Sequence, residues 1–172
     1  TLNGPWSFEE NWSGKDSYLF FGAMTGWAYT ETLLGQNFSN LLTTLPTNVH
    51  VFFISHDADP GPMMADIQQK VEAALSQMNP LGACRWRHRI HFVVTPSFED
   101  TSWIGQRFYG TDDQGQTIIE RPAFAIDRLQ QLRMVGLLAN VAAGGDADLR
   151  ALSYEPLFFN FEADREAALA SE

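Results

Sequence analysis

A β-hairpin is predicted by the sequence Glu120-Arg121-Pro122-Ala123-Phe124-Ala125-Ile126-Asp127-Arg128-Leu129-Gln130-Gln131-Leu132-Arg133-Met134-Val135-Gly136. Residues 123–126 form a short apolar run, residues 127–131 form a polar turn, and residues 132–135 form a second apolar run that Gly136 ends. Pro122 has no N–H to donate to a ladder, so we expect it before the first strand and not inside it. The earlier part of the chain must supply the sheet that this hairpin completes.

Three apolar runs predict the other strands of that sheet. They cover residues 19–23, 49–55 and 90–95, and the first two are apolar on both faces, as in buried central strands. The clearest helix is predicted over residues 63–78, where one apolar stripe recurs at helical spacing. A further helix is expected to begin near residues 28–31 and end before Pro46, and a short one is expected within residues 97–110. This alternation predicts an α/β domain with a mixed sheet.

Two polar segments beside these strands have competing interpretations. His56, Asp57 and Asp59 follow the second strand and have side chains that bind metals. No further ligand appears at a matching spacing, so we interpret these residues as a loop. Residues 85–91 alternate arginine and histidine with Trp86 and Ile90, and we interpret this basic cluster as the solvated edge of the third strand. We expect no metal and no cofactor.

The order of these elements resembles the thioredoxin-like superfamily, in particular its TlpA-like, peroxiredoxin-like and SCO-like branches. Two βα units enter a mixed sheet that ends in an antiparallel hairpin, and the likeness covers roughly residues 18–136. It implies a single three-layer domain over residues 1–172, with a mixed central sheet flanked by helices. The core would span about 18–138, with flanking extensions at 1–17 and 139–172.

Two local motifs carry the resemblance. The segment from Phe20 to Tyr29 is similar to the family's strand-to-helix segment, and aligning Ala23 with the family alanine places Gly26 and Tyr29 at the two cysteine positions. A thiolate there is stabilised by the helix N-terminus, and glycine and tyrosine cannot replace it. The second motif is Arg121-Pro122, which matches the family's cis-proline position.

The resemblance therefore implies a domain without dithiol activity. What remains is a degenerate active-site surface formed by Gly26, Trp27, Tyr29, Arg121 and Pro122. Tryptophan and tyrosine suit recognition of a partner because each buries a large rigid area and keeps a polar group. The alternative is that Trp27 and Tyr29 only fill space beneath the first helix.

Composition excludes several classes of function. The net charge of −10 disfavours nucleic acid and anionic membrane surfaces as partners, because both require clustered Lys and Arg. No apolar run approaches the roughly 18 residues of a membrane-spanning helix, and residues 1–16 lack the features of a signal peptide. Cys84 is the only cysteine, which excludes an internal disulfide and a redox pair.

We therefore expect a redox-inactive binding or structural module, part of a larger protein or a secreted product, with an extracytoplasmic compartment favoured. Its partner would be a protein, a peptide or another domain of the same polypeptide. The alternative is a thiol-dependent oxidoreductase or peroxidase-like enzyme that uses Cys84. The position of Cys84 after the second helix counts against this alternative, because a peroxidatic cysteine belongs near residues 26–29.

Overall fold

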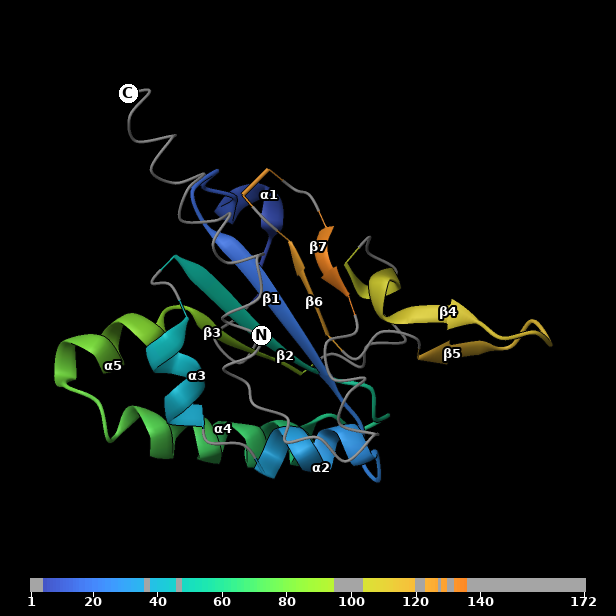
Figure 1. The fold of residues 1–172 in the computed structure, drawn as a ribbon, viewed down its shortest axis with the longest axis horizontal. Coiled ribbons are helices and arrows are strands. Elements are labelled where there is room, and N and C mark those ends of the chain that lie inside the picture. The colour runs from blue at the N-terminus through green and yellow to red at the C-terminus, as the bar shows by residue number, and fades with distance from the viewer. Residues whose placement is uncertain are drawn as a thin grey trace.

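A five-stranded sheet forms the centre of the protein in the computed structural model, which describes residues 5–35, 38–45, 48–94, 104–119, 123–126, 128–129 and 132–135 (Figure 1). The strand order is β3-β2-β1-β6-β7. The strands are β1 (Ser17–Ala23), β2 (Val49–Ser55), β3 (Ile90–Val93), β6 (Ala123–Ile126) and β7 (Leu132–Val135). A separate antiparallel pair, β4 (Tyr109–Thr111) and β5 (Thr117–Ile119), projects away from this sheet.

The sheet is mixed, as predicted. Strand β1 pairs in parallel with β2, from Ser17 opposite Val49 to Ala23 opposite Ser55, and β2 pairs in parallel with β3. On its other side β1 pairs antiparallel with β6, and β6 pairs antiparallel with β7. The predicted bounds of both hairpin strands are confirmed. Every residue of β1 is buried, because the strand has neighbours on both edges and covered faces.

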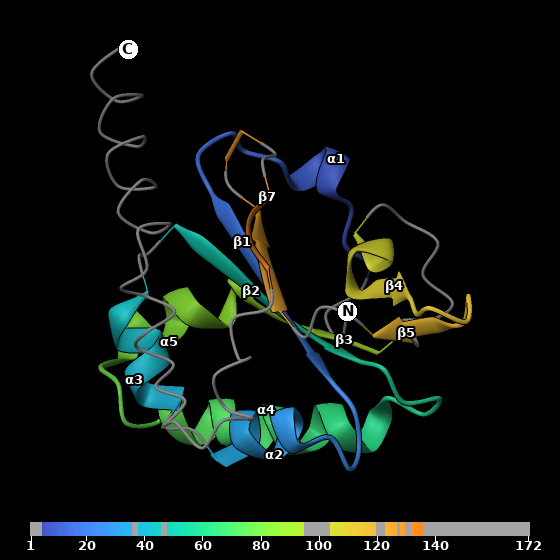
Figure 2. The ribbon, with the colours of Figure 1, turned by 45° about the vertical axis from the view of Figure 1, so that its right-hand side comes forward.

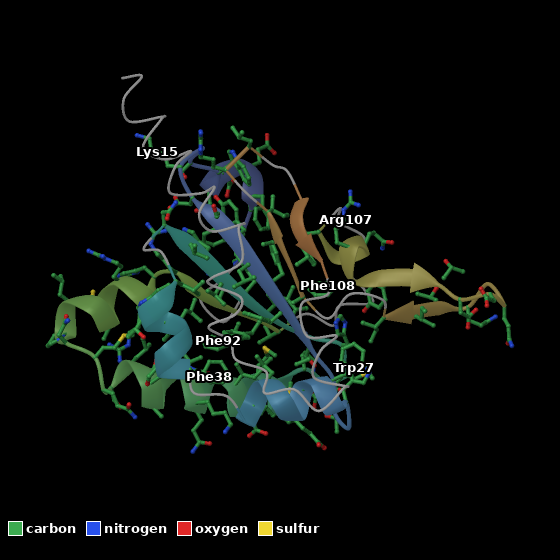
Figure 3. All side chains as sticks on the ribbon, viewed as in Figure 1. Lys15, Trp27, Phe38, Phe92, Arg107 and Phe108 are labelled. Atoms are coloured by element: carbon green, nitrogen blue, oxygen red, sulfur yellow. The ribbon has the colours of Figure 1, made fainter. Side chains whose placement is uncertain are left out.

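Four of the described helices lie against one face of the sheet (Figures 1 and 2). They are α2 (Ala28–Gly35), α3 (Phe38–Thr44), α4 (Gly61–Leu75) and α5 (Pro80–Arg87). The apolar stripe of α4 is buried, which confirms a helix here. The helix begins two residues earlier than predicted, because prolines fit its first turn, and ends at Leu75, three residues before the predicted end. Phe38 and Phe92 belong to this helical side of the core (Figure 3).

Aromatic side chains cover the opposite face of the sheet. Trp6, Phe8 and Trp12, from the segment that contains helix α1 (Phe8–Asn11), pack on a second buried cluster. Phe108, at the end of the 3-10 helix η2 (Gly105–Phe108), is fully buried in the same cluster (Figure 3). Among the described residues, an aromatic segment and a short helical turn therefore cover this face of the sheet, whereas helices α2 to α5 cover the other face.

Two predicted elements differ from the structure. The helix expected between residues 28 and 46 is divided into α2 and α3. The basic cluster was expected as the edge of a strand, but Arg85 and Arg87 form the last turn of α5, because Asn79 caps that helix by accepting the N–H of Gly82 at 2.8 Å. The first half of the helix expected within residues 97–110 lies outside the described residues, and the second half forms only the 3-10 helix η2 before β4 begins at Tyr109. None of the described helices has the length and apolar content to cross a membrane.

Candidate functional site

Strand β1 is the point at which the strand order reverses, and its carboxyl end leads into a turn. From β1 the chain proceeds to β2 and β3 on one side, and later returns to place β6 on the other side of β1. In open α/β sheets, ligands bind outside the carboxyl ends of the strands at such a point. Six described residues gather here, and we call them the carboxyl-end cluster: Thr25, Gly26, Trp27, His56, Asp57 and Tyr109.

The turn that follows β1 is held by hydrogen bonds from three directions. The carboxylate of Asp57 accepts the main-chain N–H of Thr25 at 3.0 Å and its hydroxyl at 2.8 Å. The N–H of Met24 donates to the hydroxyl of Thr30, a buried residue of α2, at 2.8 Å. The N–H of His56 donates to the carbonyl of Ala23 at 2.7 Å. The turn is therefore fixed in one conformation by β2 and α2.

Gly26 gives this turn its shape. Its φ of 77° lies in the left-handed region, where a side chain causes strain. A Cβ at this position would meet no atom within 4 Å, so the surface around Gly26 is open. Trp27 follows, half-buried, and its carbonyl accepts the N–H of Glu31 at 3.1 Å as α2 begins.

His56 is the buried polar centre of the cluster, with 8% of its surface exposed. Its Nδ1 lies 3.2 Å from the hydroxyl of Tyr109, and its ring meets Trp27 and Phe108 edge to face, with centroids 5.8 and 5.0 Å away. Burial lowers the pKa of His56 to about 4, although the charge of Asp57 opposes that shift. The imidazole is therefore neutral at pH 7.

The chemistry available to the cluster is recognition through rings and hydrogen bonds. A neutral imidazole offers one donor and one acceptor, and a phenol can serve as either. The Asp57 carboxylate is already engaged by Thr25. Within the described ranges, no group of three or more His, Cys, Asp or Glu side chains lies close enough to hold a metal ion.

The structure brings together two of the five predicted site residues. Gly26 and Trp27 lie in the cluster, and Trp27 contacts His56 while remaining partly exposed. Tyr29 is in the first turn of α2, but its side chain is outside what the structure describes. Arg121 and Pro122 also lie outside the described residues. Strand β6, which follows them, starts at Ala123 opposite Phe21, near the end of β1 that leads into the turn.

Cys84 lies elsewhere. It is exposed on α5, which occupies one end of the helical layer, whereas β1 leads into α2 at the other end (Figure 1). The only thiol of the chain is therefore not part of the carboxyl-end cluster.

Sequence reasoning missed four members of the cluster. Thr25 stands directly before Gly26, in the segment from Phe20 to Tyr29, but was not identified as a site residue. His56 and Asp57 follow a predicted parallel strand directly, and their place at its carboxyl end could have indicated a site. Tyr109 carried no such signal, since its contact with His56 joins residues 53 positions apart.

Comparison with known proteins provides no assignment. A scan against protein-family models, a search of curated proteins and a search of solved structures each found no match to this chain. Any assignment of function must therefore be argued from the geometry of the site.

Proposed function

We propose that this chain is a thioredoxin-like domain without dithiol chemistry, which binds a protein or peptide, or another domain of its own polypeptide, through the carboxyl-end cluster. The order β2-β1-β6-β7, with a helix directly after β1, supports the thioredoxin-like part of the proposal. The turn directly after β1 and helix α2 contain no cysteine, and the single thiol is on α5. These two observations support a role in binding and not in thiol exchange.

The observation that carries the binding role is the fixed presentation of Trp27. Its turn is braced by Asp57, and its ring rests against the neutral side chain of His56. A group that is already ordered loses little conformational entropy when a partner binds. Tryptophan is also the side chain that most often contributes strongly to binding at protein interfaces. A partly exposed Trp27 on a rigid turn is suited to anchor a partner.

A peptide selection tests this proposal. Displayed random peptides would be selected on the immobilised protein, and the affinity of each enriched peptide measured for the wild type and for Trp27→Ala. We expect at least one group of peptides to lose about tenfold or more in affinity for Trp27→Ala. Leu81→Ala is the matched control, because it removes another exposed apolar side chain, on α5 and with 74% of Leu81 exposed.

Two results would count against the proposal. If no enriched peptide distinguished Trp27→Ala from Leu81→Ala, the cluster would not be the binding surface. If the wild-type protein catalysed dithiol-dependent reduction of insulin, the domain would not be redox-inactive.

A further inference from the structure

Among the described residues, strand β3 forms an edge of the central sheet. In the part of the chain that the structure describes, β3 pairs only with β2. The carbonyl of Arg89 accepts the N–H of Val51 at 2.8 Å, and the parallel register continues with Val51 opposite Ile90. Because the main-chain groups of a parallel strand point alternately to its two edges, those of Ile90 and Phe92 face away from β2. They form a short row of donors and acceptors on which another strand can be built.

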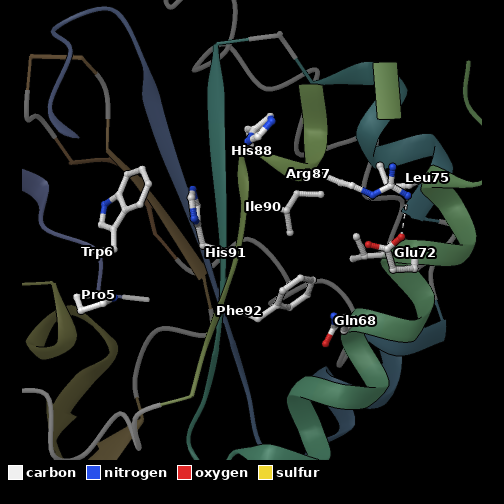
Figure 4. A pocket seen from close by; sticks show the side chains of 11 residues that line it. Pro5, Trp6, Gln68, Glu72, Leu75, Arg87, His88, Ile90, His91 and Phe92 are labelled. Atoms are coloured by element: carbon white, nitrogen blue, oxygen red, sulfur yellow. Dashed lines mark hydrogen bonds and ion pairs between the residues drawn. The ribbon is translucent and has the colours of Figure 1, made fainter. Parts of the chain in front are cut away.

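A groove of about 500 Å³ runs beside this edge (Figure 4). Figure 4 shows Trp6 and His91 on one side of β3, with Ile90 and Phe92 directed toward α4 on the other. The apolar residues Val71 and Leu75 of α4 line the groove, together with the exposed Gln68. A strand added to β3 would therefore place alternate side chains in two different environments, one of them largely apolar.

The end of the groove where β3 begins is basic, in a chain whose net charge is −10. Arg87, His88 and the single carboxylate Glu72 line the groove, and Arg85 is exposed in the same helical turn as Arg87. The Arg87 guanidinium contacts the Glu72 carboxylate at 3.0 Å, but the two side chains are 51% and 46% exposed. Since exposed ion pairs contribute little to stability, a carboxylate from a ligand can take the place of Glu72.

We propose that an extended acidic peptide binds here as an additional strand. Its main chain would hydrogen-bond to Ile90 and Phe92, an apolar side chain would enter the groove beside Val71 and Leu75, and a carboxylate would contact Arg87. Main-chain pairing of this kind gives affinity, and the side-chain sites give specificity. The β3 strand itself contains no carboxylate, so the pairing of two β3 strands would not by itself supply one to the basic end. This surface is distinct from the carboxyl-end cluster.

The experiment uses the same displayed random peptides of about twelve residues, selected on the wild-type protein. Enriched peptides that retain affinity for Trp27→Ala would be tested against two matched pairs of variants. Gln68→Trp places a bulky ring in the groove, and Gln69→Trp places the same ring on the neighbouring exposed position, outside the groove. Arg87→Glu reverses the charge at the groove, and Lys70→Glu makes the same reversal at an exposed position elsewhere on α4.

We expect peptides rich in Asp and Glu that bind at least about tenfold more weakly to Gln68→Trp and Arg87→Glu, with unchanged affinity for both controls. Amide exchange at Ile90 and Phe92 should slow when such a peptide is bound. Peptides without acidic residues, equal binding to both members of either pair, or a selection that enriches no Trp27-independent peptide would overturn the proposal. A dimer that Gln68→Trp dissociates would also overturn it, since the occupant would then be a second copy.

Discussion

The Asp57 carboxylate, just beyond the end of β2, accepts two hydrogen bonds from Thr25, which lies 32 positions earlier in the turn after β1. This contact ties together the carboxyl ends of two neighbouring parallel strands. It fixes the backbone from which Gly26 and Trp27 are presented, so the proposed binding surface depends on it.

Asp57→Ala should release that turn. We expect a loss of about 1–2 kcal/mol in the free energy of unfolding, because hydrogen bonds to a charged group are lost at a partly exposed site. Urea unfolding measures the loss, and the amide of Thr25 should exchange faster. Asp66→Ala, at an exposed position of α4, is the control and should change stability by less than about 0.5 kcal/mol. Equal effects of the two substitutions would show that the contact contributes nothing.

Gly22→Ala should destabilise the protein by crowding. A Cβ at position 22 would overlap the Nε2 atom of His56 and lie 3.1 Å from the ring of Phe108. Overpacking of this kind costs about 1–3 kcal/mol. Gly35→Ala meets no atom within 4 Å and should be neutral or stabilising by up to about 1 kcal/mol.

A double-mutant cycle identifies the cause of the Gly22 effect. In a His56→Ala background, Gly22→Ala should cost less than in the wild type, because the overlapping ring is gone. The same cost in both backgrounds would mean that the ring of His56 is not the obstacle.

Stability should fall as the pH is lowered from about 6.5. Burial lowers the pKa of His50 and of His56 to about 4, and that of His91 to about 3. Between those values and the usual 6.5, the unfolded chain binds protons that the folded chain does not. His56 and His91 therefore each remove up to about 1.4 kcal/mol per pH unit across that window, and the more exposed His50 removes less because solvent screens its charge. Urea unfolding from pH 7 to pH 4 measures the slope.

A variant separates His56 from the other histidines in that measurement. His56→Gln should make the slope shallower. Stability that stays constant from pH 6.5 to pH 4 would contradict the expected shifts.

Cys84→Ser distinguishes the binding proposal from the thiol-enzyme alternative. Because Cys84 is exposed, the substitution should change stability by less than about 0.5 kcal/mol. Peroxide consumption by the wild type should not exceed that of the variant. Catalytic consumption that disappears in Cys84→Ser would support the alternative and end the redox-inactive proposal.

The strands of the central sheet and the longest helix were predictable because each has a strong local pattern, whereas β4 and β5 were not predicted. Strand β2 is an almost unbroken apolar run, α4 has an apolar stripe at helical spacing, and a polar turn separates the two hairpin strands. Helix α5 was missed because residues 85–91, which include its last three residues, alternate in type, as an edge strand does. Its start depends on a single cap at Asn79 and on Pro80.

The only part of the candidate site that could be predicted is the part that directly follows a predicted strand in sequence. Gly26 and Trp27 follow β1 directly, so their place at the end of the sheet could be expected. The contact between His56 and Tyr109 depends on how the residues ahead of β6 pack on the face of the sheet opposite helices α2 to α5. No local sequence pattern reveals that packing. The buried environment that keeps His56 neutral arises from the same long-range packing.

The aromatic segment over the second face has a practical consequence for protein production. A shortened version that starts at Ser17 would retain every strand and yet leave Phe20 and Phe52 without Trp6 and Phe8 above them. Such a wide apolar patch promotes aggregation. A version of this domain made for expression should therefore keep residues 5–16. An affinity tag should be placed ahead of these residues with a spacer, and should not replace them.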